Sequence, residues 1–234
     1  GTEAGDLGEA LNSMLGRIET AFDERTESEA RLRRFVADAS HELRTPLTAL
    51  KGYLEVLRRK NEPRALEGAL REAGRMEALL AGLLRLSRLE ALPPQRVPLD
   101  LRAFLEAQGL EVQGEGRVLA DPELLALAVE NVLENARRHG RLPVRAELSR
   151  EGEGVWVWLV DAGPGFPEDL LPRVLEPFVH GGKGTGLGLA LVAAVARAHG
   201  GRVRVENRGG AGVGLYLPLA PLKVSPGVPF GEGG

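Results

Sequence analysis

Apolar residues in the first part of the chain recur every three or four positions, which is the spacing of one face of a helix. Residues 6–22 carry one such stripe, and two further stripes occupy residues 32–57 and 66–89. Residues 23–31 are polar on all sides but contain neither glycine nor proline, so they are expected to continue the helix. Because a turn is expected at residues 60–63, the pattern predicts an antiparallel helical hairpin.

One hairpin cannot bury two such stripes, whereas two hairpins bury them in a four-helix bundle. Residues 26–93 are therefore predicted to form a hairpin that dimerises. Residues 1–25 are predicted to be an amphipathic helix of coiled-coil type, although a plain surface helix fits their pattern equally well. The apolar positions of the hairpin are Leu32, Val36, Ala39, Leu43, Leu47, Leu50, Leu54 and Leu57, followed by Leu66, Leu70, Ala73, Met76, Leu80 and either Leu83 or Leu84, with Leu86 and Leu89 beyond.

After Pro93-Pro94 the periodicity changes, and short helices alternate with strands. Helices and mainly antiparallel strands in this order predict an α+β fold for residues 94–220, in which helices cover one face of a sheet. Residues 221–234 are rich in proline and glycine and are predicted to be disordered. The expected helices cover residues 99–108, 122–138 and 184–199, and the expected strands cover residues 117–120, 143–149, 154–160, 202–206 and 212–217.

Composition excludes several classes of protein. Of the 234 residues, 43% are hydrophobic and 27% are charged, which is ordinary for a soluble globular protein. The net charge of −3 gives no sign of nucleic-acid binding. The absence of cysteine excludes disulfides and thiolate metal sites. The sequence contains no run of about 18 apolar residues, so it predicts no membrane-spanning helix. Because the sequence opens within a helical pattern, we expect it to be part of a longer protein.

His41 falls between Ala39 and Leu43 of its stripe, so its side chain is expected to point away from the helix seam. A neutral imidazole has one ring nitrogen free to attack, and a carboxylate that accepts from the other N–H makes that nitrogen more nucleophilic. Glu42 is the nearest such carboxylate. Pro46 has no N–H, so the helix is expected to bend one turn beyond His41. Taken alone, a histidine of this kind is more often a solvated helix residue.

The predicted helix 122–138 places Asn131 and Asn135 on one face, with Glu134 and Arg138 beside them. Asparagine is only a moderate helix former, so two on one face are mildly unexpected. An amide oxygen suits Mg²⁺, which takes few protein ligands when phosphates supply the others. A solvated face with a Glu134–Arg138 ion pair would give the same pattern.

Two glycine-containing segments follow. Asp161 ends a predicted strand and precedes Gly163 and Gly165, which fits either a tight turn or a carboxylate that hydrogen-bonds an exocyclic amine of a flat ring. Residues 182–188 lead into a helix, where successive N–H groups attract phosphate. The spacing of these glycines fits neither the P-loop nor the Rossmann fingerprint.

In this order, the segments resemble one known family. The sequence SHELRTPL around His41 is similar to the phosphoacceptor motif of sensor histidine kinases. The segments NVLENARRHG, DAGPGF, EPF and GTGLGLAL resemble the N, G1, F and G2 boxes of the catalytic domain of that family. The resemblance covers about residues 6–218 and implies the GHKL ATP-binding fold that gyrase, heat-shock protein 90 and the mismatch-repair ATPases share. Residues 1–25 resemble the end of a HAMP signalling module.

The resemblance implies a role for each matching residue. His41 would accept the phosphoryl group, Glu42 would be its acid–base partner, and Thr45 would orient water to dephosphorylate a response regulator. Asn135 would hold Mg²⁺ and Asp161 would bind the adenine amine. The residues that would contact ATP are Asn131, Asn135, Arg138, His139, Asp161, Gly163, Gly165, Lys183, Gly184, Thr185, Gly186, Leu187 and Gly188.

The implied enzyme is a protein-histidine kinase that uses ATP and Mg²⁺, forms a homodimer and passes its phosphoryl group to an aspartate on the receiver domain of a response regulator. Its parent would be anchored in the bacterial inner membrane, with this portion in the cytoplasm. Two other interpretations stay open. An ATP-hydrolysing machine of the same fold would carry a glutamate where this chain has Asn131, and a dimeric scaffold would not bind ATP.

The chain departs from the family pattern in the segment over the nucleotide. Only five residues, Val179–Lys183, separate Phe178 from Gly184, where relatives usually carry a longer lid. A short lid sequesters the phosphates poorly, so the sequence predicts fast nucleotide exchange and weak ATP affinity. Lys183 would supply a point charge to the phosphates, or it would be a solvated loop lysine.

Overall fold

The computed structural model describes residues 3–60, 62–181 and 184–219. The chain divides into two compact units, Gly1–Glu77 and Ala78–Gly234, and the boundary falls inside a helix. The tail predicted to be disordered, residues 221–234, lies outside the described residues.

The first unit is built from one whole helix and the first part of a second. α1 covers Glu3–Lys60 without interruption, so it continues through the polar segment 23–31 as expected, and also through Pro46. α2 covers Pro63–Ala91. The two helices approach closely where the ring of Tyr53 lies against Gly68, a position at which any larger side chain would collide with the ring. The predicted helical hairpin is confirmed.

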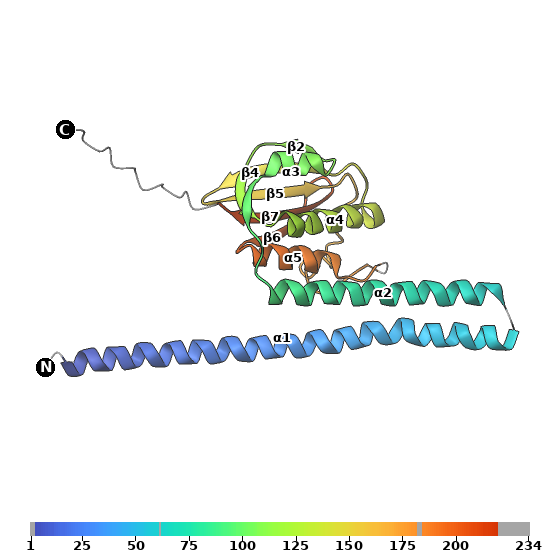
Figure 1. The fold of residues 1–234 in the computed structure, drawn as a ribbon, viewed down its shortest axis with the longest axis horizontal. Helices are drawn as coiled ribbons and strands as arrows, with labels where there is room; N and C mark the ends of the chain where they lie inside the picture. The colour runs from blue at the N-terminus through green and yellow to red at the C-terminus, as the bar shows by residue number, and fades with distance from the viewer. Residues whose placement is uncertain (1–2, 61, 182–183, 220–234) are drawn as a thin grey trace, which may run out of the picture. The chain divides into compact units, whose positions relative to one another are not determined.

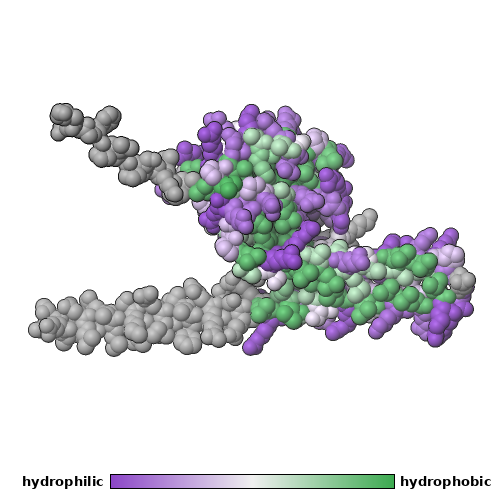
Figure 2. Space-filling model, in the orientation of Figure 1, coloured by the Kyte–Doolittle hydropathy of each residue, from purple (hydrophilic) through white to green (hydrophobic). Residues whose placement is uncertain are grey.

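Many positions of the apolar stripes predicted from the sequence stay exposed within one chain. Leu70 is 64% exposed and Leu54 is 48% exposed, although both occupy stripe positions. Figure 2 shows apolar side chains gathered along the hairpin. An extended apolar surface of this kind normally marks a contact with another protein. The same stripes leave Leu32, Val36, Leu47, Leu66 and Leu80 exposed.

The second unit contains a five-stranded sheet with the order β2-β4-β5-β7-β6 and a separate two-stranded ribbon of β1 and β3 (Figure 1). β2 and β4 run parallel, whereas all other paired strands are antiparallel. The strands are β1 (Val97–Asp100), β2 (Glu111–Gln113), β3 (Arg117–Ala120), β4 (Arg145–Glu151), β5 (Gly154–Val160), β6 (Arg202–Asn207) and β7 (Ala211–Pro218), and the helices are α3 (Leu101–Ala107), α4 (Pro122–His139) and α5 (Gly188–Ala198).

The helices of this unit share one apolar core with one face of the sheet. The core includes Ala128, Val132, Val157, Leu159, Val192, Val195 and Val213. On the opposite face, Trp156 and Trp158 stack at 5.6 Å between ring centroids, and arginines of β6 and the following turn lie over them. This arrangement is the α+β sandwich that the sequence predicted.

The helix predicted at residues 99–108 begins later than expected. Residues Val97–Asp100 form β1, which pairs with β3. The Asp100 side chain accepts a hydrogen bond from the Ala103 N–H (3.2 Å) and so caps α3. The N-cap therefore sets the first residue of the helix, and the apolar residues before it belong to a strand.

The sequence pattern did not predict β2, and it placed the start of β4 too early. No periodic signal marks β2, because its three residues are too few to show alternation. The strand expected at residues 143–149 spans Arg145–Glu151 instead. Pro143 has no N–H to donate to a neighbouring strand, which disfavours an earlier start.

His199, just beyond α5, links that helix to the start of α4. Its side chain is buried; Nε2 accepts from the Asp121 N–H (2.9 Å) and Nδ1 bonds the Val195 carbonyl (2.8 Å). The Asp121 N–H only donates, so Nε2 carries no proton and the ring is neutral. Asp121 also caps α4 by accepting from the N–H groups of Glu123 and Leu124. One histidine thus fixes the relative position of two helices.

We expect the stability of this unit to depend on the charge of His199. Burial lowers the pKa of His199, the Val195 hydrogen bond opposes that shift, and the Arg96 and Asp121 charges act in opposite directions. A histidine with a lowered folded-state pKa stabilises the fold above its unfolded pKa of about 6.5, and that stability is lost as the pH falls below this value.

The melting temperature of the wild type should therefore fall more steeply between about pH 7 and pH 5 than that of His199→Gln, whose side chain does not titrate. Thermal unfolding followed by circular dichroism measures both slopes. His139→Gln, which removes an exposed histidine, should keep the wild-type slope. Equal slopes for the wild type and His199→Gln would contradict this role.

Candidate active site

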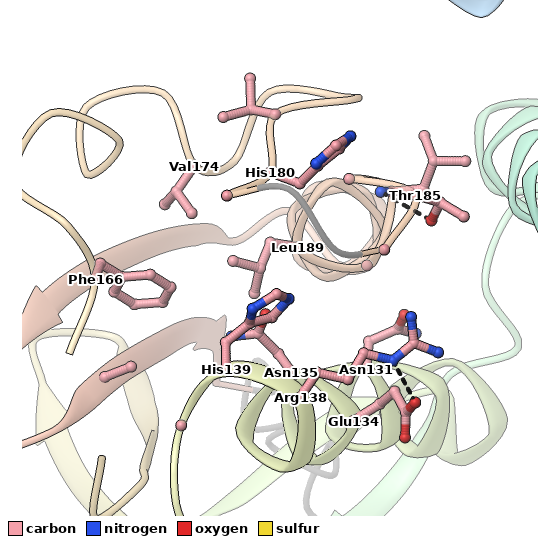
Figure 3. A pocket seen from close by; sticks show the side chains of 18 of the residues that line it. Asn131, Glu134, Asn135, Arg138, His139, Phe166, Val174, His180, Thr185 and Leu189 are labelled. Atoms are coloured by element: carbon pink, nitrogen blue, oxygen red, sulfur yellow. Dashed lines mark hydrogen bonds and ion pairs between the residues drawn. The ribbon is translucent and has the colours of Figure 1, made fainter. Parts of the chain in front are cut away.

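In the second unit, α4, the start of α5, the loop after β5 and residues 78–85 of α2 line an open cavity of about 570 Å³. Ligand sites in proteins generally have volumes of about 300–1,000 Å³, so the cavity has the size of a ligand site. Figure 3 shows Asn135 and His139 on the α4 side of the cavity and His180 and Thr185 on the other side. Most of the polar residues that the sequence assigned to the ATP site therefore lie around one cavity: Asn131, Asn135, Arg138, His139, Asp161 and Thr185.

The asparagines of α4 face the cavity because the apolar side of this helix is buried in the core. Asn131 Nδ2 donates to the Leu127 carbonyl (2.8 Å), and its Oδ1 faces Gly188, where a Cβ would lie 3.2 Å away. No described residue hydrogen-bonds the half-buried side chain of Asn135. The Asn135 amide oxygen is therefore available to a ligand in the cavity.

Arg138 forms an ion pair with Glu134 one helical turn away, with 2.7 Å between Nε and Oε1. A hydrogen bond from Arg138 is the main cause that lowers the pKa of Glu134. The guanidinium also reaches the glycine-rich segment, because a Cβ on Gly184 would lie 3.6 Å from Nη1. Both residues line the cavity, as does His139 at the end of α4 (Figure 3). The ion pair and the predicted cavity position of Arg138 are thus both present.

Asp161 is 6% exposed and lies at the end of β5. Its Oδ1 accepts from the N–H groups of Gly163 (2.8 Å) and Ala211 (2.9 Å), which fixes the carboxylate. Its Oδ2 lies against Gly140, where a larger side chain would collide with it, and Gly163 lies against the same residue. Among the described residues only Oδ1 is bonded, so Oδ2 remains for a donor in the cavity.

The glycine-rich segment forms a loop before α5 and not its first turn. The sequence predicted a helix from Gly184, but α5 begins at Gly188. Gly184 and Gly186 have φ angles of 108° and 68°, which a right-handed helix does not contain. The Phe178 N–H donates to the Gly186 carbonyl (2.9 Å), and a Cβ on Gly186 would collide with the Phe178 backbone.

Among the described residues, no side chain makes a cap hydrogen bond at the N-cap of α5, so the first N–H groups of this helix favour an anion. Thr185 lines the cavity, and its Oγ1 accepts from the Leu187 N–H at 3.4 Å. Leu187 also lines the cavity, and its side chain is buried. Lys183, the predicted phosphate cation, lies outside the described residues.

The predicted phosphoacceptor residues lie in the first unit, on one stretch of α1. His41 is exposed, and Glu42 beside it is half-buried. The Thr45 hydroxyl donates to the His41 carbonyl at 3.4 Å, one helical turn back. Pro46 is buried and has no N–H, so the Glu42 carbonyl lacks its usual helix donor. His41, Glu42 and Thr45 therefore lie next to a turn of α1 in which Pro46 donates no backbone hydrogen bond.

The cavity also has an apolar side to which sequence reasoning assigned no residue. Phe166 is 8% exposed, and Val174 and Leu189 line the cavity with it (Figure 3). Apolar walls with a few placed polar groups are typical of sites for flat ring ligands. The available signal was an apolar residue at the end of DAGPGF, but nothing local indicates that Phe166 faces a cavity.

Two family models match the chain. Residues 31–92 match the His Kinase A (phospho-acceptor) domain. Residues 120–221 match the histidine kinase-, DNA gyrase B- and HSP90-like ATPase. The hairpin therefore matches the phospho-acceptor domain of histidine kinases, and most of the sandwich matches their ATPase domain.

Curated relatives agree with this class. The signal transduction histidine-protein kinase AfsQ2 of Streptomyces coelicolor is 33% identical over 255 residues, which cover 94% of this chain and 48% of that protein. The probable sensor histidine kinase TcrY of Mycobacterium tuberculosis is 38% identical over 203 residues, which cover 77% of this chain and 42% of that protein. The chain belongs to the sensor histidine kinase family. It spans about half the length of the curated relatives it matches.

A solved structure shows the same fold. The histidine kinase AdeS of Acinetobacter baumannii has a TM-score of 0.60, and the match covers 77% of this chain and 98% of that one. At 23% sequence identity this similarity concerns the fold alone.

Proposed function

We propose that this chain is the catalytic core of a kinase that phosphorylates His41 with ATP. The observation that carries the proposal is the convergence of Asn135, Asp161 and the glycine loop on one cavity, in a chain that also exposes His41. One ring nitrogen of His41 would attack the γ-phosphorus while its bond to the ADP oxygen breaks. Glu42 would accept the proton from the other ring nitrogen.

The cavity would hold the nucleotide at both ends. Asp161 Oδ2 would accept from the adenine amine, and Phe166 would cover the apolar face of the base. Arg138 and the N–H groups at the start of α5 would bind the phosphates. Asn135 fits Mg²⁺, because an amide oxygen without a protein partner is a suitable ligand for an ion that otherwise keeps phosphate oxygens and water. The ion would neutralise phosphate charge.

We also propose a homodimer and a protein acceptor for the second transfer. A second hairpin would bury the exposed leucine stripes in a four-helix bundle. An aspartate carboxylate on the receiver domain of a response regulator would then attack the phosphorus on His41, and the imidazole would leave. The exposure of His41 fits this step, because the acceptor is another protein.

The whole protein would extend beyond this chain, because the chain covers only 48% of AfsQ2. Residues 1–25 would be the end of a HAMP module, residues 26–93 the dimerisation domain and residues 94–220 the catalytic domain. The parent would be a receptor in the bacterial inner membrane with this portion in the cytoplasm, where ATP is present. Within the described part of the chain, no helix has both the length and the apolar character of a membrane span.

The main alternative is an ATPase of the same fold. Water attack needs a base, and Asn131, whose amide cannot accept a proton, stands beside Gly188 where such an ATPase would carry a glutamate. Purified protein mixed with ATP and Mg²⁺ should therefore give a burst of protein labelling that saturates, with little free phosphate. Steady phosphate release without labelling would favour the ATPase, and no ATP binding at millimolar concentration would favour a scaffold.

Replacing Thr45 by alanine is expected to slow dephosphorylation of the regulator at least about tenfold while leaving autophosphorylation intact. The Thr45 hydroxyl lies one turn from His41 and bonds its carbonyl only weakly, at 3.4 Å, so it is free to orient water. Phosphate release from a phosphorylated receiver domain measures this activity. Thr48→Ala, which removes a hydroxyl bonded to the Arg44 carbonyl (2.9 Å), is the control. An equal loss of both activities would make Thr45 a helix-bending residue beside Pro46.

A further inference from the structure

The loop Asp161–Phe166 lines the part of the cavity that would hold the adenine base. Different contacts hold the two ends of this loop. At its start, Asp161 bonds Gly163 and Ala211, and the Ala162 N–H donates to the Arg141 carbonyl (2.8 Å). At its far end, the backbone of Phe166 is held by one side chain from a distant strand. That side chain is Asn207, the last residue of β6.

Asn207 holds both backbone polar groups of Phe166. Its Oδ1 accepts from the Phe166 N–H (2.7 Å), and its Nδ2 donates to the Phe166 carbonyl (3.0 Å). A planar amide used in this way reproduces the pairing of a neighbouring strand, so it fixes both the position and the direction of the backbone. The Phe166 ring, which lines the cavity (Figure 3), projects from this backbone.

Gly165 makes this approach possible. Its φ of 87° lies in the left-handed region, and a Cβ there would be 2.5 Å from Asn207 Oδ1. A side chain at this position would therefore displace the amide as well as strain the backbone. The second glycine of the DAGPGF segment thus makes room for Asn207. The sequence pattern had indicated only that this glycine lets a flat ring approach the backbone.

A turn-capping role does not explain Asn207. The turn between β6 and β7 is closed by a backbone bond from the Arg208 N–H to the Gly210 carbonyl (2.9 Å). Among the described residues, the hydrogen bonds of the Asn207 side chain both go to Phe166 and none goes to this turn.

We propose that Asn207 is a positioning residue for base recognition: it holds Phe166 against the adenine while Asp161 reads the exocyclic amine. The inference rests on the proposed ATP site and adds to it the residue that sets the geometry of its base end. Loss of the two Asn207–Phe166 hydrogen bonds would weaken contacts to the base. Contacts to the phosphates would stay unchanged, because they come from α4 and the Gly184–Gly188 segment.

The test compares two nucleotides on three variants. GTP carries the same triphosphate as ATP but lacks the adenine amine, so its binding reports on the phosphate end. Asn207→Ala removes both hydrogen bonds. Asn207→Asp keeps the size and the acceptor but places a second oxygen against the Phe166 carbonyl. Arg204→Ala, on the same strand, removes a guanidinium 4.9 Å from the Trp156 ring and controls for loss of stability.

Calorimetry with Mg²⁺ should show ATP affinity reduced about five- to tenfold in Asn207→Ala and at least as much in Asn207→Asp, the scale of one or two lost hydrogen bonds. GTP affinity should stay within about twofold of the wild type, so the preference for ATP shrinks. Autophosphorylation should show a raised KM for ATP with kcat nearly unchanged. Arg204→Ala should lower the melting temperature without changing either affinity.

Two results would overturn the inference: unchanged ATP affinity in both Asn207 variants, or equal losses for ATP and GTP, which would mark a purely structural role. Failure of the wild type to bind ATP is a different result. It would overturn the proposed function itself, and the inference with it.

Discussion

Replacing His41 by glutamine is expected to abolish labelling of the protein by γ-labelled ATP. Glutamine has a similar reach and polarity but no nucleophilic ring nitrogen, so the phosphoryl group has no acceptor. His41 is exposed on α1, outside the unit that encloses the cavity. ATP affinity should therefore stay at the wild-type value, and calorimetry alongside the labelling assay would show the separation.

The matched control for this prediction is Thr48→Ala, a change on the same helix whose hydroxyl bonds only the Arg44 carbonyl. It should label like the wild type. Persistent labelling of His41→Gln would move the acceptor to another residue, and loss of ATP binding in that variant would mean that the substitution had disturbed more than the acceptor.

Replacing Asn135 by alanine should reduce the rate of autophosphorylation by about a hundredfold or more, because the ion that neutralises the phosphates would lose its protein ligand. Asn135 is half-buried, lines the cavity and has no hydrogen-bond partner among the described residues. The fold should tolerate the change, since alanine is the best helix former and no bond of the protein is lost. Initial labelling rates over a range of Mg²⁺ concentrations would measure the effect.

Arg137→Ala on the same helix is a suitable control, because Arg137 is exposed and only its weaker ion pair with Glu134, at 3.4 Å, is lost. It should retain a near-normal rate. A normal rate for Asn135→Ala would mean that other groups hold the ion. Loss of dimerisation in that variant would be unexpected, because Asn135 lies in the second unit and the apolar stripes lie on the hairpin.

The sequence pattern predicted best the long helices, in which the apolar spacing repeats over several turns. α4 was predictable because both of its signals, the cap Asp121-Pro122 and the apolar face, come from neighbouring residues in the sequence. The start of α5 was not, since the positive φ angles of Gly184 and Gly186 depend on contacts with Phe178. Glycine permits both a helix and such a loop, so composition alone could not decide between them.

Local sequence also predicted some residues of the site and missed others. Asn131, Asn135 and Arg138 share a helical face, so their common direction follows from spacing alone. Phe166 and Asn207 lie 41 residues apart and meet through the backbone of one and the side chain of the other. No local pattern encodes such a pair, because any residue presents the same N–H and carbonyl to an amide. Only the register of β6 against β7 brings Asn207 to this loop.

The most direct test of the central claim is the chemistry of the bond formed with γ-labelled ATP and Mg²⁺. Phosphohistidine is acid-labile and alkali-stable, whereas phosphoserine and phosphothreonine survive acid. We expect the wild-type protein to carry label that is lost in acid, kept in alkali and recovered on the peptide that contains His41. Acid-stable label, label on another peptide, or free phosphate without labelled protein would contradict it.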